Sequence, residues 1–526
     1  RGTLFPYTTL FRSKQEAQVL SDEFNNRGFR TTSLTGEDGQ EKREKEIEKL
    51  VANSGDILDY IFTVDIFNEG IDIPEVNQVV MLRPTQSAII FIQQLGRGLR
   101  KNKDKDFVVI IDFIANYKNN FLIPIALSGD RTYDKDTARK FLSQGNRYLP
   151  GMSTIHFDNI SKQRIYSAID NVKLNTWLFI SDEYNKLKNK LGRIPTYYDF
   201  ENYDTLDIKK IFEVAGSYYA FLSRKDRDYS YNGKISKTAE NMLNFVSTNL
   251  ILSKKIEELI LLRLILKNSQ KLEEDFRGVM LTDYTKLIAD YELEVSRKIL
   301  TNNFVTSSVT KKKFNDCIFL DEYNKVIKPS KELEKELQSN IFRTLLTELV
   351  EYGIYRYNKY YKDNLYRDTN FVLYEKYSFE DICKLFSWSI NYVPLAIGGY
   401  KYDEQTKTLP VFINYDIDKN SFNHDYVHGF LPDNGFTSMS KPRRNLESRE
   451  CEYFYKDETK IYLFMRKNKD DKDGARIFYF LGEMKTVGKP ELVYREKSGD
   501  TVLQFFYKLQ TPLREDMYEY FTKEKI

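Results

Sequence analysis

The chain has 526 residues, of which 41% are hydrophobic and 30% are charged. This length predicts two to four domains, and the composition is ordinary for a globular protein with true hydrophobic cores. The formal net charge is only +3, so overall charge alone does not indicate a nucleic-acid partner, although a local basic groove is compatible with it.

The cysteines and the apolar segments exclude several further classes of protein. The three cysteines, Cys317, Cys383 and Cys451, are odd in number and far apart. This usage indicates reduced thiols in a cytoplasmic protein and argues against a disulfide framework or a zinc site. No secretory signal is visible. The most apolar segment, residues 249–267, predicts an amphipathic helix and no membrane span, because charges interrupt it at Lys254, Lys255, Glu257, Glu258 and Arg263.

The first residues differ in character from those that follow. The chain begins with Arg1, and the string RGTLFPYTTLFRS resembles the translation of a sequencing adapter. We therefore expect residues 1–13 to be a non-native leader and exclude them from the fold prediction. The alternative is an ordinary short strand that involves Leu10 and Phe11.

Residues 14–128 alternate between helical and extended patterns. Residues 14–27 and 40–52 have helical periodicity, and Gly28 is placed to end the first helix. Residues 31–34 predict a short strand, and three short runs rich in Ile, Val and Phe lie at 58–64, 78–82 and 107–113. Such runs, separated by helices, are typical of a parallel sheet buried on both faces. We predict an α/β layer domain for this part of the chain.

Two further regions follow this domain. Residues 129–377 are charged, rich in Tyr and mainly α-helical in pattern, with helical periodicity at 177–191 and 332–352 and a new helix expected at Thr196. Residues 378–526 predict a small, mainly β domain. Its expected strands are 393–401, 409–415, 460–466, 476–481 and 502–508.

Two motifs in the α/β domain carry the chemical information. FTVDIFNEGIDIP, residues 62–74, ends a buried strand, and QQLGRGLR, residues 93–100, lies on a helix after the next strand. Arg97 and Arg100 are three residues apart and therefore share one helix face. Rigid guanidinium groups suit the negative charge that develops on phosphate oxygens during ATP hydrolysis. Gly96 allows this helix to approach a partner domain closely.

FTVDIFNEGIDIP and QQLGRGLR resemble motifs V and VI of bacterial superfamily 2 DNA helicases of the DEAD/DEAH-box type. TSLTGED, residues 32–38, resembles the strand and loop that precede motif V in this family. The resemblance implies that residues 14–128 form the second RecA-like motor domain. It implies ATP and Mg²⁺ as cofactors and DNA as partner. The site residues that it implies are Arg97 and Arg100 as sensors of the γ-phosphate, Gln93, Gly96, Gly70 and Asp72 near the nucleotide, and Glu69 at the nucleic-acid backbone.

The printed sequence contains no phosphate-cradling loop of the form Gly-x-x-x-x-Gly-Lys-Ser/Thr and no acidic metal motif in the expected place. IFLDE, residues 318–322, imitates a strand with paired carboxylates, but it follows the second motor domain. We therefore expect a truncated, C-terminal part of a longer helicase. Its first motor domain would hold most of the ATP and Mg²⁺, and this chain alone would not hydrolyse ATP.

Residues 385–484 resemble a domain at the end of a group of bacterial helicases, some of which also carry nuclease domains. FSWSINYVPLAIGGY and GFLPDNGFTSMSKPRRNLES are among the strings that carry this resemblance. Residues 440–449 predict a DNA-binding loop between strands, with Lys441, Arg443, Arg444 and Arg449 for phosphates and Trp388, Tyr392, Tyr400 and Phe436 for base stacking. The alternative is a solvated basic turn with aromatic residues in the core.

Two other functions stay open at this stage. One is a non-catalytic DNA-binding or target-recognition protein with a vestigial motor half. The other, less favoured, is a nuclease that uses Glu483 and Lys485, with Asp416 and Asp418 as further ligands. His424 and His428 are four residues apart but have no third strong ligand nearby, so we predict no metal site. The residues alone do not distinguish DNA from RNA.

Overall fold

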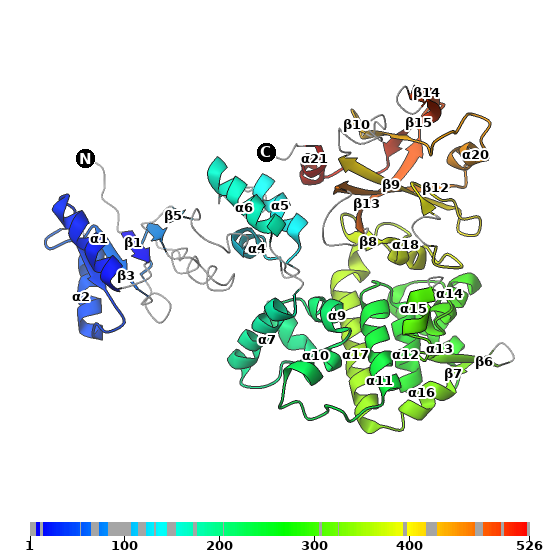
Figure 1. The fold of residues 1–526 in the computed structure, drawn as a ribbon, viewed down its shortest axis with the longest axis horizontal. Coiled ribbons are helices and arrows are strands. Elements are labelled where there is room, and N and C mark those ends of the chain that lie inside the picture. The colour runs from blue at the N-terminus through cyan, green and yellow to red at the C-terminus, as the bar shows by residue number, and fades with distance from the viewer. Residues whose placement is uncertain are drawn as a thin grey trace. The chain divides into compact units, whose positions relative to one another are not determined.

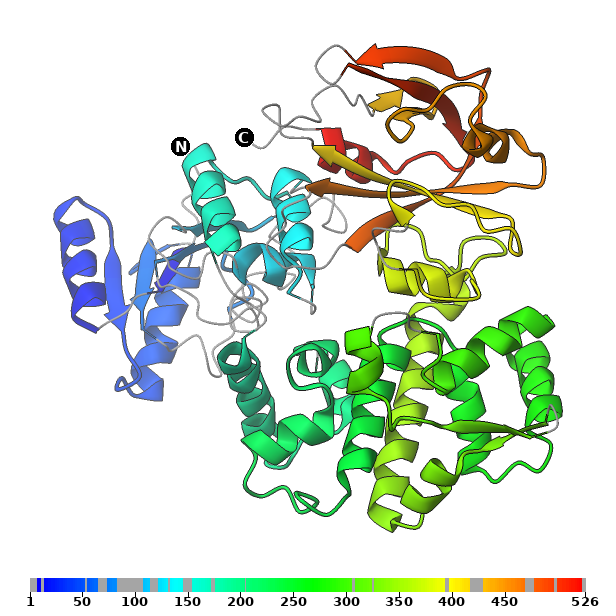
Figure 2. The same cartoon turned by 45° about the vertical axis from the view of Figure 1, so that its right-hand side comes forward.

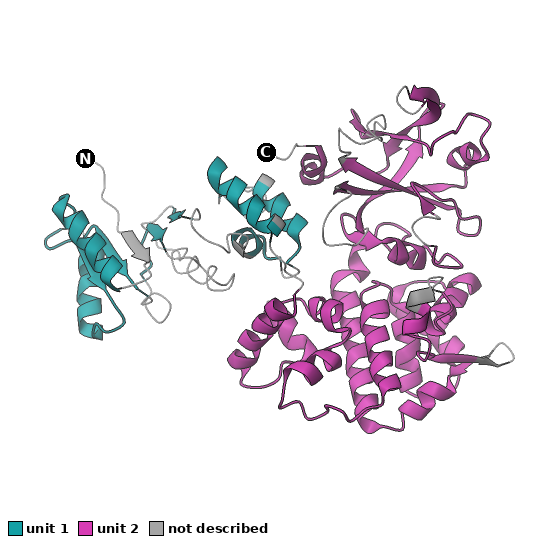
Figure 3. Ribbon diagram, viewed as in Figure 1, with its two compact units in different colours: residues 1–174, 526 teal, residues 175–525 magenta. Residues whose placement is uncertain are grey.

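The computed structural model describes residues 7–10, 14–52, 54–64, 73–82, 107–113, 122–130, 133–144, 154–171, 176–203, 205–304, 308–323, 326–392, 397–416, 429–468, 477–495 and 499–522. The chain forms two compact units, Arg1–Leu174 and Asn175–Lys525 (Figure 3). Figures 1 and 2 show the elements of each unit.

The first unit contains a five-stranded parallel sheet. In spatial order its strands are β2 (Thr31–Leu34), β3 (Tyr60–Thr63), β1 (Tyr7–Leu10), β4 (Gln78–Met81) and β5 (Val109–Asp112). Every pairing in this sheet is parallel, so each connection must cross from one end of the sheet to the other. The predicted parallel α/β sheet is confirmed.

Strand β1 occupies the centre of this sheet. Tyr7 is in register with Tyr60 of β3 on one side and with Gln78 of β4 on the other. These residues belong to the segment that resembles an adapter translation, and their conformation is the short strand of the alternative interpretation. A central position satisfies backbone donors and acceptors on both sides of a strand, so a short extended run suits it. The origin of the segment stays a hypothesis.

Helices α1 (Lys14–Asn26) and α2 (Gln40–Val51) follow the predicted ranges closely. On α1, Ala17 is fully buried and belongs to a small cluster with Phe62 of β3, against which Leu20 and Phe24 pack. Gly28, with φ of +90°, follows the end of α1, in a left-handed conformation that glycine adopts without steric cost. The described helices that complete the unit are α4 (Leu122–Ser128), α5 (Lys135–Gln144) and α6 (Asn159–Asn171).

The second unit begins with a helical region, as predicted. Its described elements are α7 (Trp177–Leu191), α8 (Tyr197–Asn202), α9 (Lys209–Ala215), α10 (Tyr218–Lys225), α11 (Lys237–Phe245), the π-helix η4 (Val246–Ile251), α12 (Glu257–Leu266), α13 (Leu272–Tyr284), α14 (Asp290–Leu300), α15 (Ser308–Lys313), the hairpin β6 (Leu320–Tyr323) and β7 (Val326–Pro329), α16 (Lys331–Glu336), α17 (Asn340–Tyr360) and the 3₁₀ turn η5 (Lys362–Asn364). Thr196 caps α8 with a reciprocal capping box through Asp199, which confirms the predicted start.

Two expected helices are each divided in the structure. Residues 249–267 contain the end of η4 and all of α12, separated at Lys254, which has φ of +62°. The Lys254 ammonium group donates to the Lys376 carbonyl at 2.6 Å, so a distant contact holds this break. Residues 332–352 are divided because the Ser339 hydroxyl caps α17, accepting from the Phe342 amide.

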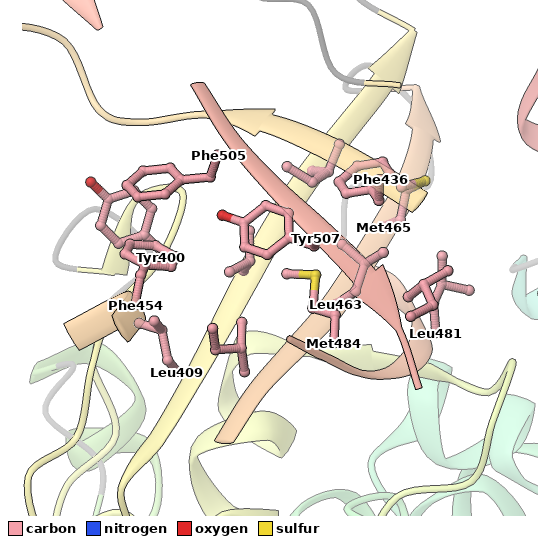
Figure 4. Packing of buried hydrophobic residues seen from close by; sticks show 14 of the residues in the cluster. Tyr400, Leu409, Phe436, Phe454, Leu463, Met465, Leu481, Met484, Phe505 and Tyr507 are labelled. Carbon is pink, nitrogen blue, oxygen red and sulfur yellow. The ribbon is translucent and has the colours of Figure 1, made fainter. Parts of the chain in front are cut away.

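The rest of the second unit is a mixed, mainly β region, which confirms the predicted fold class. Its elements are β8 (Lys376–Ser378), α18 (Phe379–Leu385), β9 (Thr408–Asp416), β10 (Gly429–Leu431), β11 (Gly435–Met439), α20 (Arg449–Tyr455), β12 (Lys460–Asn468), β13 (Ile477–Thr486), β14 (Glu491–Arg495), β15 (Asp500–Leu509) and α21 (Glu515–Thr522). The main sheet has the order β10-β11-β15-β13-β12-β9. Residues 397–401, part of an expected strand, form no strand. Figure 4 shows the core that this sheet covers.

Polar contacts join the helical region to the β region. The Lys384 ammonium group of α18 donates to the Asn249 carbonyl of η4 at 3.1 Å, and the Asn391 amide donates to the Phe304 carbonyl at 2.9 Å. Buried polar groups need such partners, so these contacts are consistent with a single compact unit.

All three cysteines are buried and unbridged. Burial raises the pKa of the Cys383 thiol to about 12, which keeps it protonated and unreactive at neutral pH. No helix in the described part of the chain is long and apolar enough to span a membrane.

Candidate nucleotide and nucleic-acid sites

The two strands that precede the motif segments, β3 and β4, end at the same edge of the parallel sheet. Thr63, at the end of β3, and Met81, at the end of β4, are both in register with Leu10 of the central strand β1. Because the strands are parallel, their carboxyl ends form one row. Ligands of open α/β sheets bind outside such carboxyl ends. This edge is therefore the candidate nucleotide site.

The motif residues themselves lie outside the described residues. This applies to Glu69, Gly70, Asp72, Gln93, Gly96, Arg97 and Arg100, so their roles stay predictions. The described residues nearest to this segment are buried: Thr63 and Val64 precede it, and Ile73 and Val76 follow.

Asp112 is a candidate that the sequence interpretation missed. It ends β5 in register with Met81, so it lies at the same carboxyl edge. Its Oδ2 atom is buried and has no hydrogen-bond partner among the described residues. Burial raises the pKa of this carboxyl to about 7, and perturbed carboxyls at a ligand-binding edge are functional candidates. The sequence feature that could have identified Asp112 was an acidic residue at the end of an apolar strand.

In the C-terminal basic loop, Arg444 and Lys441 have partners inside the protein. The Arg444 guanidinium donates to both carboxylate oxygens of Glu450, at 2.6 and 3.2 Å, and the Tyr400 hydroxyl donates to the same carboxylate at 2.9 Å. Burial acts to raise the pKa of Glu450, but these hydrogen bonds outweigh it and the pKa is lowered. The Lys441 ammonium group lies 4.6 Å from the centre of the Tyr400 ring. These two basic residues hold the loop in place.

Arg443 and Arg449 are different, because their side chains are exposed. No hydrogen bond or ion pair joins either side chain to another described residue. The Arg443 backbone amide donates to the Thr501 carbonyl of β15 at 2.9 Å. Arg449 is the first residue of α20, not part of a loop between strands as expected. Of the four predicted phosphate ligands, these two stay available.

The predicted stacking platforms are wrong for three of the four aromatic residues. Trp388, Tyr400 and Phe436 are buried, and Figure 4 shows Tyr400 and Phe436 among the core side chains of the β region. The Trp388 indole donates to the Thr408 hydroxyl at 2.8 Å. Tyr392 is half-buried, and the Lys401 ammonium group lies 4.3 Å from its ring centre. Core packing therefore explains the buried rings, as the alternative interpretation states.

The nuclease alternative gains no support from the described residues. The Glu483 carboxylate is paired with the Arg367 guanidinium at 2.8 Å, and Asp418, His424 and His428 lie outside the described residues. In the described part of the chain, no group of three His, Cys, Asp or Glu side chains is arranged to hold a metal ion. Asp321 of IFLDE lies in the β6–β7 hairpin, not at the end of a parallel strand.

Comparison with known families divides the chain into three matched ranges. Residues 7–102 match the helicase conserved C-terminal domain. Residues 180–362 match a domain of unknown function (DUF8090), and residues 371–521 match a second domain of unknown function (DUF3427). The chain therefore contains a range that matches the helicase conserved C-terminal domain, followed by two ranges that match domains of unknown function.

Two curated proteins that are similar to part of the chain are named as helicases. The chain is 33% identical over 121 residues to the putative ATP-dependent helicase IRC3 of Saccharomyces cerevisiae. This aligned region covers 23% of the chain and 17% of that protein. The chain is also 31% identical over 112 residues to the ATP-dependent RNA helicase SrmB of Haemophilus influenzae. Here the aligned region covers 21% of the chain and 24% of that protein. The chain thus spans less than a quarter of the length of these two relatives.

Among solved structures, the C-terminal domain of the DEAD-box protein Dbp5 is similar, with 23% identity, a TM-score of 0.20, and coverage of 23% of this chain and 67% of that chain. The ATP-dependent type ISP restriction-modification enzyme LlaBIII bound to DNA is also similar, with 16% identity, a TM-score of 0.22, and coverage of 66% of this chain and 21% of that chain.

Proposed function

We propose that this chain supplies the second RecA-like motor domain and the nucleic-acid-contacting C-terminal extension of an ATP-dependent DNA helicase or translocase. The match of residues 7–102 to the helicase conserved C-terminal domain carries the proposal. The common carboxyl edge of β3 and β4 supports it, because the strands that precede both motif segments end there.

In this proposal, Arg97 and Arg100 contact the γ-phosphate of ATP that a first motor domain holds with Mg²⁺. Their fixed positive charges offset the charge that develops on the phosphate oxygens, a role for which arginine suits better than lysine. Gln93, Gly96, Gly70 and Asp72 line the nucleotide side of the cleft, and Glu69 contacts the nucleic-acid backbone.

ATP turnover tests this proposal. The chain is joined to, or mixed with, a first motor domain that carries the phosphate loop, and ATP hydrolysis is followed with and without DNA. Arg97→Ala and Arg100→Ala should each lower kcat by roughly 10³-fold, the effect of removing an arginine finger. Arg27→Ala is the matched control, because this exposed arginine of the same domain pairs with Glu23, four residues before it, and lies outside both motifs. Turnover that neither motif substitution changes would contradict the proposal.

The exposed side chains of Arg443 and Arg449 favour a second candidate function, a DNA-binding or target-recognition protein that needs no catalysis. DNA binding that is independent of ATP, together with an inactive motor in the assay above, would select this candidate. Phosphate contacts make binding fall with salt, with a slope that decreases by about one for each contact removed. Arg443→Ala and Arg449→Ala should each lower that slope, whereas Arg367→Ala, which removes an internal ion pair, should not.

A further inference from the structure

We propose that the β region binds single-stranded nucleic acid on a surface formed by Arg443, Leu446, Arg449 and Tyr494, called the Arg443 surface below. This inference rests on the proposed function and specifies the form of the nucleic acid. Unpaired bases would lie on Tyr494 and Leu446, and their phosphates on the two arginines.

The two apolar members of this surface have largely exposed side chains. Tyr494 is 64% exposed and Leu446 is 60% exposed, whereas neighbouring aromatic residues such as Phe454 and Phe505 are buried in the core. Isolated exposed apolar residues are common on protein surfaces, so exposure alone carries no function. Here two exposed apolar side chains accompany two exposed arginines without described partners.

Backbone contacts place Arg443 and Tyr494 near each other, and the Cys451 thiol bonds the Asn445 carbonyl at 3.3 Å, which ties the start of α20, where Arg449 lies, to the same loop. The Arg443 amide bonds the Thr501 carbonyl at 2.9 Å, and Thr501 is in register with Tyr494 across the β14–β15 pair. Neighbouring strands are about 4.8 Å apart, so the Tyr494 and Arg443 backbones are separated by about 10 Å. Leu446 follows Arg443 by three residues and lies within roughly 11 Å of it along the chain. A surface of this size suits a few nucleotides of a single strand.

The loop that carries Arg443 and Leu446 is fixed from within. The Asn445 amide donates to the Ser448 hydroxyl at 3.0 Å, and the Cys451 thiol donates to the Asn445 carbonyl at 3.3 Å. Arg444 is held by Glu450 as described above. A loop that is already ordered loses little conformational entropy when a ligand binds, so its exposed tip is prepared for contact.

Arg443 itself has a backbone φ of +60°. This left-handed conformation is uncommon for a residue with a long side chain. Surrounding contacts must hold it, and such outliers are found disproportionately at ligand-binding positions. The bond from Arg443 to Thr501 is one of these contacts.

A single strand fits this surface better than a duplex. In a duplex the base faces are stacked on one another, so a tyrosine or leucine side chain cannot lie against them without unstacking. In a single strand every base offers an open face, and aromatic stacking then adds to phosphate contacts. Two arginines give only a small electrostatic contribution, so base contacts are needed for useful affinity.

Binding measurements on the full chain test the inference. A labelled oligothymidine and a duplex of equal length are titrated at low salt, and fluorescence anisotropy gives Kd. Tyr494→Ala should weaken binding of the single strand about 5- to 150-fold, the range for loss of one stacked base. Tyr494→Phe keeps the ring and should bind like the wild type. Tyr518→Ala, on α21, is the matched control, since Tyr518 is 46% exposed in the same region.

The outcomes separate this inference from the proposed function. Loss of single-strand affinity in Tyr494→Ala and Leu446→Ala, with unchanged Tm, supports the inference. The single-strand inference is overturned if Arg443→Ala and Arg449→Ala weaken binding but the two apolar substitutions do not. It is also overturned if the duplex binds as tightly as the single strand. In both cases the proposal of a DNA-contacting loop stands. The ATP hydrolysis test of Arg97 and Arg100 is independent of all these results.

Discussion

Gly353 in the middle of α17 is required by the packing of the helical region. A Cβ atom at this position would lie 2.9 Å from Ile251 Cγ1 of η4 and 3.0 Å from Leu259 Cδ1 of α12. These distances are shorter than ordinary van der Waals contact between carbon atoms. The absent side chain therefore permits the close approach of α17 to both neighbours.

Gly353→Ala combines two opposing effects. Alanine stabilises a helix interior by about 1 kcal/mol relative to glycine, but an extra methyl group in a packed core costs about 1–3 kcal/mol. The expected net change in unfolding free energy is a loss of about 0–2 kcal/mol. Gly278→Ala in α13 is the matched control, because nothing lies within 4 Å of a Cβ atom there. This control should gain about 1 kcal/mol.

Urea unfolding of the two variants, followed through the transition of the second unit, measures both changes. The difference between the variants isolates the packing cost, since the helix-propensity gain is common to them. A Gly353→Ala variant stabilised as much as Gly278→Ala would refute the close packing of α17 on η4 and α12.

Three further predictions concern buried charges. Glu258→Ala should lower the unfolding free energy by about 3–5 kcal/mol, because it removes the carboxylate that pairs with Lys255 at 2.6 Å, where the Lys255 side chain is 1% exposed. In urea titrations the double variant Lys255→Met with Glu258→Leu should recover most of this loss. An unfolding free energy that Glu258→Ala leaves unchanged would contradict the prediction. Burial acts to raise the pKa of Glu257, but the attractions of Lys286 and Lys255, together with hydrogen bonds, outweigh it and lower the pKa to about 2. The stability from this group is therefore present above its ordinary pKa of 4.5 and is lost as pH falls toward 2. Glu257→Gln should flatten that acid loss in unfolding curves, and an unaltered acid profile would count against the pairing. Burial disfavours the charged form of Asp112 and raises its pKa to about 7. The folded protein therefore loses stability at this group as pH rises from the ordinary pKa of 3.8 through 7. Asp112→Asn should therefore raise the Tm of the first unit more at about pH 8 than at about pH 4, and equal changes at both values would exclude this cause.

Local patterns were sufficient to predict much of the fold. The expected strands at 31–34, 58–64, 78–82 and 107–113 all became strands of the parallel sheet. The runs at 58–64 and 78–82 gave the clearest signal, because strands buried in a parallel sheet have nearly continuous apolar sequences. Helix α7 has the predicted bounds, since Thr176 caps its start and Gly192 follows its end in a left-handed conformation.

Long-range contacts determined what the patterns did not reveal. The break at Lys254 depends on the Lys376 carbonyl, 122 residues away, and no local period encodes such a partner. In the basic loop, Arg444 and Glu450 are six residues apart, a spacing that predicts no helical or strand pair. The sequence identified the right loop as basic, but the structure was needed to separate the two internally paired residues from Arg443 and Arg449.

We propose that this chain completes a nucleic-acid-stimulated ATPase. Its most direct test is the ratio of ATP turnover with and without single-stranded DNA, for the chain combined with a first motor domain, in wild type and in Arg97→Lys. We predict clear stimulation in the wild type and its loss in Arg97→Lys with DNA binding retained, because lysine keeps the charge but not the planar, multidentate geometry of arginine. Equal stimulation in both proteins, or none in the wild type, would contradict the claim.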